Sequence, residues 1–168
     1  MTGLANAVFN KHDVLLVILD NGTTAMTGHQ PNPGVCTSVL GEGCNHLDIE
    51  SVVRGIGVTD VAKVKPFNMR GTLKTIEEMK ARSGDRVIIA EEPCMLFARR
   101  TLKQNRPQVA EVATQGEEAL KCLAELACPA FRRGGTAEAP VVSVDESQCS
   151  GCMVCLQVTP AIRARKRS

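Results

Sequence analysis

The amino-acid sequence predicts an α/β protein built on a parallel sheet, followed by a small cysteine-rich module. In the first part of the chain, apolar runs suited to buried strands alternate with amphipathic helical patterns, an order typical of right-handed parallel βαβ units. Hydrophobic residues make up 43% of the 168 residues, which is enough for a globular core. Near the end of the chain, three cysteines recur at two-residue spacing, which indicates metal ligation.

Six elements are expected in the first part, residues 1–97. They are, in order, the end of a helix over 4–10, a strand over 14–19, a helix over 46–55, a strand over 58–65, a helix over 71–82 and a strand over 86–90. The first strand is an apolar run suited to burial on both faces of a sheet, and the two later helices carry apolar residues at helical spacing. The intervening residues 20–46 form a long glycine-rich loop, and loops of that length in compact domains are usually functional.

The second part is predicted to have less regular structure. Residues 98–115 are interpreted as a linker with a weak helix, because basic residues cluster there beside a proline. Glycines and prolines over 134–140 predict a hairpin or loop that leads into a short strand over 141–144. The basic residues over 163–167 are expected to form a frayed terminus. The basic cluster of the linker could bind an acidic partner such as a ferredoxin, although a solvated face is the simpler interpretation.

Composition and charge argue against several classes of function. A net charge of +2, the absence of Trp and Tyr, and only four Phe argue against nucleic-acid binding. No apolar run approaches about 18 residues, so no membrane span is expected. The sequence after Met1 lacks the pattern of a signal peptide, so a cytoplasmic protein is expected, and its eight cysteines then favour metal ligation over disulfides.

The loop after the first strand holds the most distinctive polar run. Asp20, Asn21 and Gly22 come where the carboxyl end of that strand should lie, the edge at which open α/β sheets bind ligands. Asn21 and the threonine hydroxyls that follow offer the oxygen ligands that Mg²⁺ prefers, often together with phosphates. One interpretation is therefore a Mg²⁺–diphosphate loop. Asp-Asn-Gly is also strong turn chemistry, and the pattern alone favours an ordinary turn.

A resemblance to a known family favours the first interpretation. The segment Leu19-Asp-Asn-Gly-Thr-Thr-Ala-Met-Thr-Gly-His-Gln-Pro-Asn-Pro-Gly34 resembles the thiamine-diphosphate loop of the large (alpha) subunit of indolepyruvate:ferredoxin oxidoreductase, and Thr2–Asn10 and Val87–Cys94 also resemble that family. The resemblance covers nearly the whole chain but only the C-terminal portion of a family member. It implies a thiamine-diphosphate-binding domain that is truncated at its N-terminus, followed by a ferredoxin-like [4Fe–4S] module. The family's Gly-Asp-Ser motif, whose Asp is a Mg²⁺ ligand, would lie just upstream of the first residue.

The same resemblance assigns roles within the loop. Asn21 and the backbone carbonyl of Thr23 would ligate Mg²⁺. The cofactor-binding residues would be Asn21, Gly22, Thr23, Thr27 and Gly28, with the last two near the diphosphate. No catalytic residue is assigned.

Cys149, Cys152 and Cys155 form a Cys-x2-Cys-x2-Cys run. Three thiolates at this spacing hold three corners of a [4Fe–4S] cluster, and the fourth ligand comes from elsewhere in the chain. Zinc is the alternative metal, although zinc sites favour two paired Cys-x2-Cys knuckles over a triple.

The fourth ligand follows from the resemblance of residues 116–168 to a bacterial ferredoxin, in which two such runs exchange their last cysteine. One ligand set would comprise Cys128, Cys149, Cys152 and Cys155, and the other would comprise Gly116, Ala119, Cys122 and Thr159. Only the first set is complete. One [4Fe–4S] cluster with Cys128 as its remote ligand is therefore expected, and the alternative is that Cys128 is a buried free thiol like Cys122.

The remaining cysteines and His29 are less informative. Cys36 and Cys44 could form a redox pair or lie near the cofactor, but isolated loop cysteines are the simpler interpretation. The role of Cys94 is open. His29 lies in the cofactor loop and could face the substrate or the diphosphate, although a structural or exposed histidine is the default expectation.

The family resemblance implies a subunit or fragment of a thiamine-diphosphate-dependent 2-oxoacid (indolepyruvate or aryl pyruvate):ferredoxin oxidoreductase. Such an enzyme decarboxylates its substrate oxidatively and passes electrons through iron–sulfur clusters. The implied partners are the small (beta) subunit, ferredoxin, coenzyme A and a 2-oxo acid. The alternative is a stand-alone iron–sulfur electron-transfer protein, catalytically inactive because the upstream Asp is missing. A decayed or wrongly started reading frame is a third possibility.

Overall fold

The chain folds into two compact units, residues 1–103 and 104–168, each with a core of its own. The computed structural model describes residues 1–35, 40, 43, 45–100 and 106–167. No helix in these ranges combines the length and the apolar character that a membrane crossing requires.

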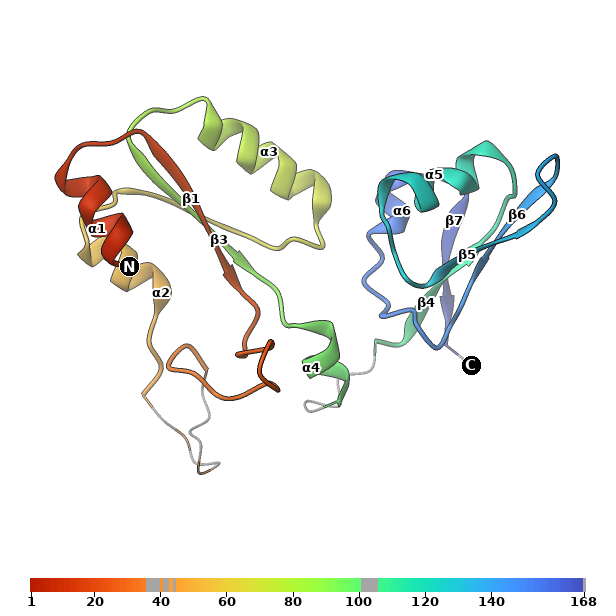
Figure 1. Cartoon of the computed structure of the whole chain (residues 1–168), viewed down its shortest axis with the longest axis horizontal. Coiled ribbons are helices and arrows are strands. Elements are labelled where there is room, and N and C mark those ends of the chain that lie inside the picture. Colours follow the sequence, from red (N-terminus) through yellow and green to blue (C-terminus); the bar gives the residue numbers. More distant parts are fainter. Residues whose placement is uncertain (36–39, 41–42, 44, 101–105, 168) are drawn as a thin grey trace. The chain divides into compact units, whose positions relative to one another are not determined.

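The first unit contains a parallel three-stranded sheet with helices on both faces (Figure 1). Its elements are α1 (Thr2–Phe9), β1 (Val14–Asp20), α2 (Ile49–Gly55), β2 (Asp60–Val64), α3 (Met69–Lys80), β3 (Asp85–Glu91) and α4 (Met95–Arg100). The strand order is β1-β3-β2, and both neighbours run parallel to β3. The predicted α/β class and parallel sheet are therefore confirmed. Asp20 pairs with Glu91 in this register, so the carboxyl ends of β1 and β3 meet at one edge.

Alternate residues of the central strand β3 face two separate cores. Val87 and Ile89 pack with residues of α1 and α2, whereas Ile88 packs with Met79 of α3 on the opposite face. This alternation follows from the two-residue period of a strand. Asp48 caps α2 by accepting a hydrogen bond from the Ser51 N–H at 2.9 Å, which places the start of that helix later than the predicted residue 46.

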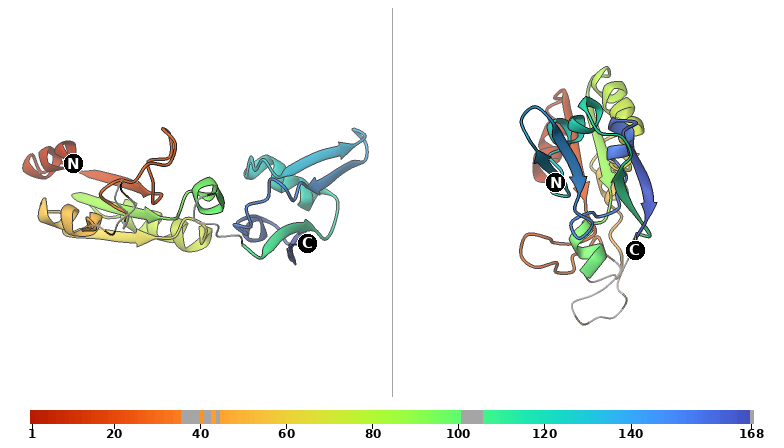
Figure 2. Two further views of the ribbon diagram at one scale, coloured as in Figure 1. Left: turned by 90° about the horizontal axis from the view of Figure 1, so that it is seen from below. Right: turned by 90° about the vertical axis from the view of Figure 1, so that its right-hand side faces the viewer.

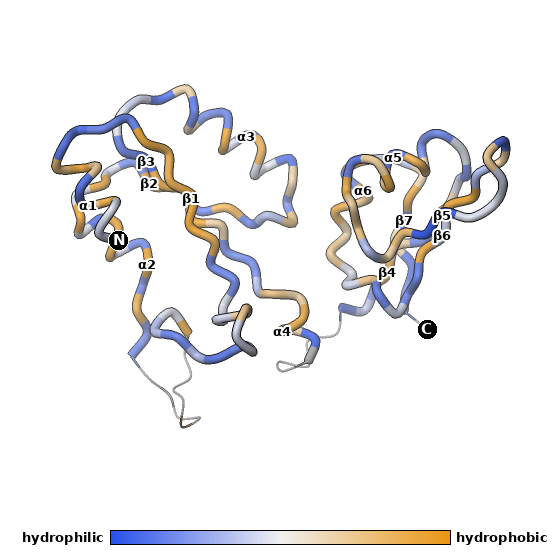
Figure 3. The backbone as a smooth tube through the Cα atoms, viewed as in Figure 1, coloured by the Kyte–Doolittle hydropathy of each residue, from blue (hydrophilic) through white to orange (hydrophobic). Residues whose placement is uncertain are grey.

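Strand β1 differs from its prediction as a strand buried on both faces. It is hydrophobic along most of its length (Figure 3), yet it lies at the edge of the described sheet. Val17 is 47% exposed and Leu19 is 77% exposed. The apolar composition indicated a strand correctly, but it could not indicate that β3, and not β1, takes the central position.

The second unit is built from two strand–helix–strand segments. Its elements are β4 (Gln108–Val112), α5 (Glu117–Glu125), β5 (Phe131–Gly135), β6 (Pro140–Val144), α6 (Cys155–Val158) and β7 (Ile162–Lys166). Strands β4 and β7 pair antiparallel, as do β5 and β6. The predicted hairpin is present: β5 and β6 project together from the rest of the unit (Figure 2).

The prediction of a frayed basic terminus is wrong, and the segment interpreted as a linker contains a strand. Residues 108–112 form β4 and pair with residues 162–166 of β7. The charges conceal apolar residues in both strands: Val109, Ala110 and Ile162 are buried, while Arg163 is exposed and pairs with Glu111 at 2.8 Å. The sequence prediction counted the basic residues of each segment separately, so it missed that the two segments cover each other's apolar side chains.

Candidate functional sites

The first candidate site is the loop that follows β1 at the carboxyl edge of the parallel sheet. The Glu92 N–H donates to the Asp20 carbonyl at 3.0 Å, and the Cys94 N–H donates to the Asn21 carbonyl at 2.9 Å. The chain after β3 is thus bonded to the chain after β1. The polar run predicted at this edge lies there, as the topology of open α/β sheets leads one to expect.

Two side-chain turns shape the start of this loop. Asp20 Oδ1 accepts from the Gly22 N–H and Asn21 Oδ1 accepts from the Thr23 N–H, both at 3.1 Å. Gly22 has a φ of +68°, a left-handed conformation that favours glycine. Thr23 is only 5% exposed, and its hydroxyl donates to the Gln30 carbonyl at 3.4 Å. Asn21, Gly22 and Thr23 therefore form an ordered turn of oxygen-bearing groups at the sheet edge, so the turn and the ligand interpretations are compatible.

Thr27 and Gly28 lie at the exposed tip of the same loop. The Thr27 hydroxyl donates to Gln30 Oε1 at 2.7 Å, and the Gln30 amide donates back to the Thr27 carbonyl. Gly28 has a φ of +109°. The loop folds back on itself through the pairing of Thr24 with Gln30. All five residues predicted to bind the cofactor thus belong to one hydrogen-bonded loop.

His29 packs against an aromatic residue that the sequence analysis did not single out. Its ring stacks on Phe97 of α4, with ring centroids 5.6 Å apart and an interplanar angle of 27°. Its Nδ1 atom is buried and has no hydrogen-bond partner within the described residues. His29 is therefore a packed, half-buried residue. Cys36 and Cys44 lie outside the described residues.

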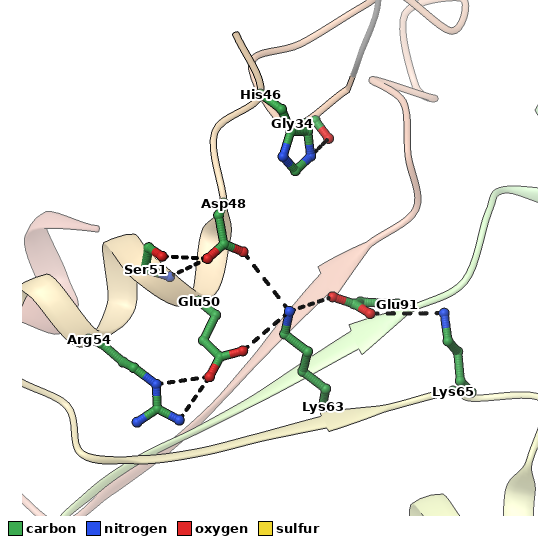
Figure 4. Close-up of polar contacts among 9 residues, drawn as sticks. All are labelled: Gly34, His46, Asp48, Glu50, Ser51, Arg54, Lys63, Lys65 and Glu91. Carbon is green, nitrogen blue, oxygen red and sulfur yellow. Dashed lines mark hydrogen bonds and ion pairs between the residues drawn. The ribbon is translucent and has the colours of Figure 1, made fainter.

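A charged network ties α2 to the same sheet edge (Figure 4). Lys63 Nζ lies 3.2 Å from a Glu50 oxygen and 3.3 Å from a Glu91 oxygen, and Arg54 pairs with Glu50 at 2.8 Å. Hydrogen bonds from Arg54 and Lys63 hold the pKa of the Glu50 carboxyl below its ordinary value. Hydrogen bonds to Glu50 and then Glu91 raise the pKa of Lys63. Glu50 and Arg54 form an i, i+4 pair on α2, whereas Lys63 and Glu91 lie on separate strands, so no local motif could have revealed their part in the network.

The second candidate site is a cavity of about 140 Å³ in the second unit. Cys128, Cys149, Cys152 and Cys155, the four predicted cluster ligands, all line it. The remaining wall is mainly apolar and includes Leu126, Ala130, Phe131 and Val144. The fold thus brings the remote thiol of Cys128 to the three thiols of the Cys-x2-Cys-x2-Cys run.

Glycine is required within the cysteine run for a steric reason. Gly151 has a φ of +72°, and a Cβ atom there would lie 2.6 Å from the Gln108 carbonyl and 2.9 Å from Arg106 Cβ. The run therefore packs directly against the backbone of β4. Cys149 is the first residue of the run, and its N–H donates to the Asp145 carbonyl at 3.0 Å.

Burial and neighbouring thiols raise the pKa values of two cysteines of this unit, Cys155 and Cys122, and so favour their protonated forms when no cation is bound. Burial raises the pKa of Cys155 to about 12, and Cys122 and the three other cavity cysteines raise it further. Burial, followed by the neighbouring Cys128, raises the pKa of Cys122 to about 11. A bound cation would reverse this balance, because a coordinating thiol loses its proton. The chemistry of the donor set therefore fits a metal or an iron–sulfur cluster.

Zinc and a [4Fe–4S] cluster place different demands on the spacing of their thiol ligands. Within the described residues, no three His, Cys, Asp or Glu side chains form a group that could hold a single metal ion. The sulfurs around one zinc ion would stand about 3.8 Å apart, given bonds of about 2.3 Å and tetrahedral geometry. Each thiolate of a [4Fe–4S] cluster binds a different iron, so its ligands stand farther apart around a cavity. The four thiols that line the apolar cavity are soft donors of the kind that both zinc and iron–sulfur clusters take.

Three of the four positions of the incomplete second ligand set are buried, whereas the fourth, Gly116, is exposed. Ala119 and Cys122 are fully buried, and Thr159 is 2% exposed. The Thr159 hydroxyl donates to a Glu118 carboxylate oxygen at 3.0 Å and accepts from the Ala161 N–H at 3.2 Å. Side-chain packing and hydrogen bonds thus occupy the place where the resemblance to ferredoxins would put a second cluster.

Comparisons with known proteins concern both units. Residues 1–90 match the family described as thiamine pyrophosphate enzyme, C-terminal TPP binding domain. Proteins named indolepyruvate oxidoreductase subunit IorA match 94% of the chain, with 39% identity in Archaeoglobus fulgidus and 40% in Methanothermobacter thermautotrophicus. The protein of that name in Thermococcus kodakarensis is 35% identical over 95% of the chain. The chain spans about a quarter of the length of these relatives, 25%, 24% and 25% respectively. No solved structure matches the chain.

Proposed function

Because the chain belongs to the thiamine pyrophosphate enzyme family, through the C-terminal domain that binds this cofactor, we propose that it is part of a 2-oxo acid oxidoreductase. The first unit contributes a share of a thiamine diphosphate site, and the second unit holds one [4Fe–4S] cluster. The observation that carries the proposal is the presence in one chain of an ordered loop at the sheet edge and a cavity lined by four thiols.

In the first unit, Asn21 Oδ1 and the Thr23 carbonyl are the proposed Mg²⁺ ligands, because both belong to the ordered turn after β1. Gly22, Thr27 and Gly28 are proposed to face the diphosphate, where small residues let the backbone approach it closely. When bound, thiamine diphosphate supplies the carbanion chemistry that decarboxylates a 2-oxo acid. The residues of this chain hold and orient the cofactor.

In the second unit, Cys128, Cys149, Cys152 and Cys155 are the proposed ligands of the cluster. The order strand–helix–strand, repeated once over residues 108–166, supports the ferredoxin-like character proposed for the second unit. When bound, the cluster supplies a one-electron acceptor for a centre that releases two electrons. The apolar wall around the thiols keeps water away from it.

The relatives named indolepyruvate oxidoreductase subunit IorA suggest the substrate and the partners. We propose an aryl 2-oxo acid such as indolepyruvate as substrate, coenzyme A as acyl acceptor and a ferredoxin as electron acceptor. The remaining parts of the site are proposed to come from a small (beta) subunit and from the portions of the relatives that this chain does not span.

Cofactor titration tests the first unit. The chain, co-expressed with a polypeptide that carries the rest of a relative, is titrated with thiamine diphosphate and Mg²⁺ in a calorimeter. Asn21→Ala is expected to weaken binding at least about tenfold. Asn32→Ala is the matched control, because Asn32 Oδ1 accepts from the Gly34 N–H at 2.9 Å in a similar turn. Equal affinity for the wild-type chain and Asn21→Ala would contradict the assignment.

A stand-alone iron–sulfur electron-transfer protein is the second candidate, because all four proposed cluster ligands come from the second unit alone. It predicts a reducible cluster without affinity for thiamine diphosphate, even in the co-expressed complex. The calorimetric titration, combined with iron analysis of the same sample, separates the two candidates.

A further inference from the structure

Cys149 receives two contacts that none of the other cavity cysteines is described as receiving. The Ala110 N–H donates to Cys149 Sγ at 3.5 Å. The Arg167 guanidinium donates from Nη2 to the Cys149 carbonyl at 2.7 Å. One contact reaches the ligand sulfur itself, and the other holds the backbone of the same residue.

The register of β4 and β7 explains why the Ala110 N–H is free to reach the sulfur. The Arg167 N–H donates to the Pro107 carbonyl at 2.8 Å, and the Ala113 N–H donates to the Ala161 carbonyl at 2.8 Å. In an antiparallel ladder, hydrogen-bonded pairs alternate with pairs that point outward. Ala110 falls on an outward position, opposite Ala164. Its N–H therefore points away from β7 and toward the cysteine run.

Arg167 connects three segments of the second unit. Its backbone N–H bonds to Pro107, just before β4, and its Nη1 atom donates to the Glu146 carbonyl at 3.1 Å. Its Nη2 atom donates to Cys149. An arginine fork that holds two carbonyls keeps its position better than a single contact would. The guanidinium thus places a permanent positive charge beside the first cysteine of the run.

We propose that Arg167 is a positioning residue that, together with the Ala110 N–H, raises the reduction potential of the cluster held by Cys149. Reduction adds one negative charge to a cluster. A hydrogen bond to a ligand sulfur and a nearby fixed cation both stabilise that added charge. The inference rests on the proposed [4Fe–4S] cluster and deepens it, because it identifies which ligand the protein tunes.

The test is a potentiometric titration of the full chain with its cluster loaded, using dithionite as reductant and electron paramagnetic resonance as readout. Arg167→Gln is expected to shift the midpoint to a more negative potential, beyond the spread of replicate titrations. Arg167→Lys keeps the charge and is expected to retain most of the wild-type potential. Arg163→Gln is the matched control on β7, where the side chain is 66% exposed and pairs with Glu111, and its midpoint is expected to equal that of the wild-type chain.

Ala110→Pro provides an independent test if Arg167→Gln fails to hold a cluster. Proline removes the N–H at a position that donates no bond to β7, so the ladder is kept, and Ala110→Gly is the control that retains the donor. Ala110→Pro is expected to lower the midpoint, whereas Ala110→Gly leaves it unchanged. Loaded Arg167→Gln and Ala110→Pro proteins with wild-type midpoints would overturn the inference while leaving the cluster itself intact. A wild-type chain that assembles no cluster would instead overturn the proposed function.

Discussion

The two candidate sites of this chain differ in how their donors are supplied. In the second unit, four thiols from two segments of the chain converge on one apolar cavity. In the first unit, backbone and side-chain oxygens line an open loop at a sheet edge, and they already accept hydrogen bonds from N–H and O–H groups of the same loop. A buried site of soft donors is thus assembled within one small unit. A site of hard oxygen donors at an open sheet edge needs a further segment, facing the loop, to complete its set of ligands.

The largest expected effect is the response of the metal-free chain to alkaline pH. Burial raises the pKa of Cys155 from 9.0 to about 12 and that of Cys122 from 9.0 to about 11. Both thiols are more acidic in the unfolded chain, so their contribution to stability is complete below about pH 9 and is lost as the pH rises toward the folded values. Each thiol removes about 1.4 kcal/mol per pH unit over that interval.

Urea unfolding of the metal-free chain between pH 8 and 11 measures this loss. Cys122→Ala is the informative variant, because it removes one of the two titrating thiols and should flatten the dependence. A free energy of unfolding of the second unit that stays constant over this range would contradict the burial of the thiols.

The substitution Gly151→Ala tests how tightly the cysteine run of the second unit is packed, for comparison with the loop of the first unit. A Cβ at this position would meet the Gln108 carbonyl, and the residue has a left-handed φ. We expect Gly151→Ala to destabilise the second unit by about 3 kcal/mol, as the sum of a left-handed backbone and a steric displacement. Iron retention should fall with it. Thermal unfolding measures the loss of stability, and iron analysis measures the iron retained. A variant with wild-type values in both measurements would show that the cysteine run does not pack on β4.

Alanine at Gly22 is the matching change in the first unit. Gly22 also has a left-handed φ, but, apart from its chain neighbours, no atom of the described residues lies within 4 Å of the position that a Cβ would take there. Gly22→Ala should therefore cost only about 1 kcal/mol, the backbone contribution alone. The unfolding of the first unit measures it, and iron content should not change. A loss as large as that of Gly151→Ala would mean that the loop is as tightly packed as the cysteine run.

The smallest effect is expected in the charged network beside the loop. Lys63 is 41% exposed, and exposed ion pairs contribute little. Lys63→Met should change the free energy of unfolding only slightly, and the change should shrink further at high salt. Urea unfolding at two salt concentrations checks this. A change of several kcal/mol would show that the network organises the whole sheet edge.

Sequence patterns predicted those features that depend on neighbouring residues. Helices α1, α2 and α3, the parallel strands of the first unit and the hairpin at 134–140 follow from apolar spacing and turn residues, and the structure confirms them, whereas α5 was not predicted. Features that depend on distant pairing were missed. Three contacts join segments that share no local sequence signal: β4 pairs with β7, His29 stacks on Phe97, and Arg167 donates a hydrogen bond to the Cys149 carbonyl. The edge position of β1 was missed for the same reason.

The cysteine motif and the resemblance to ferredoxins predicted which four cysteines should lie together, and all four line one cavity. The spacing of Cys149, Cys152 and Cys155 required a fourth thiol, and the resemblance to ferredoxins chose Cys128 over Cys122. The structure places Cys128 on the cavity wall and Cys122 in the core behind it. The motif could not predict the apolar side chains that line the cavity, or the burial that raises the pKa of Cys155.

Iron analysis of two single-cysteine variants after anaerobic reconstitution tests the central claim most directly. The account predicts about four irons per chain in the wild type and in Cys122→Ala, and loss of nearly all iron in Cys128→Ala. Cys122 is the matched control, because it is close to Cys128 in sequence and fully buried but does not line the cavity. Full iron in Cys128→Ala, loss of iron in Cys122→Ala, or zinc in place of iron in the wild type would contradict it.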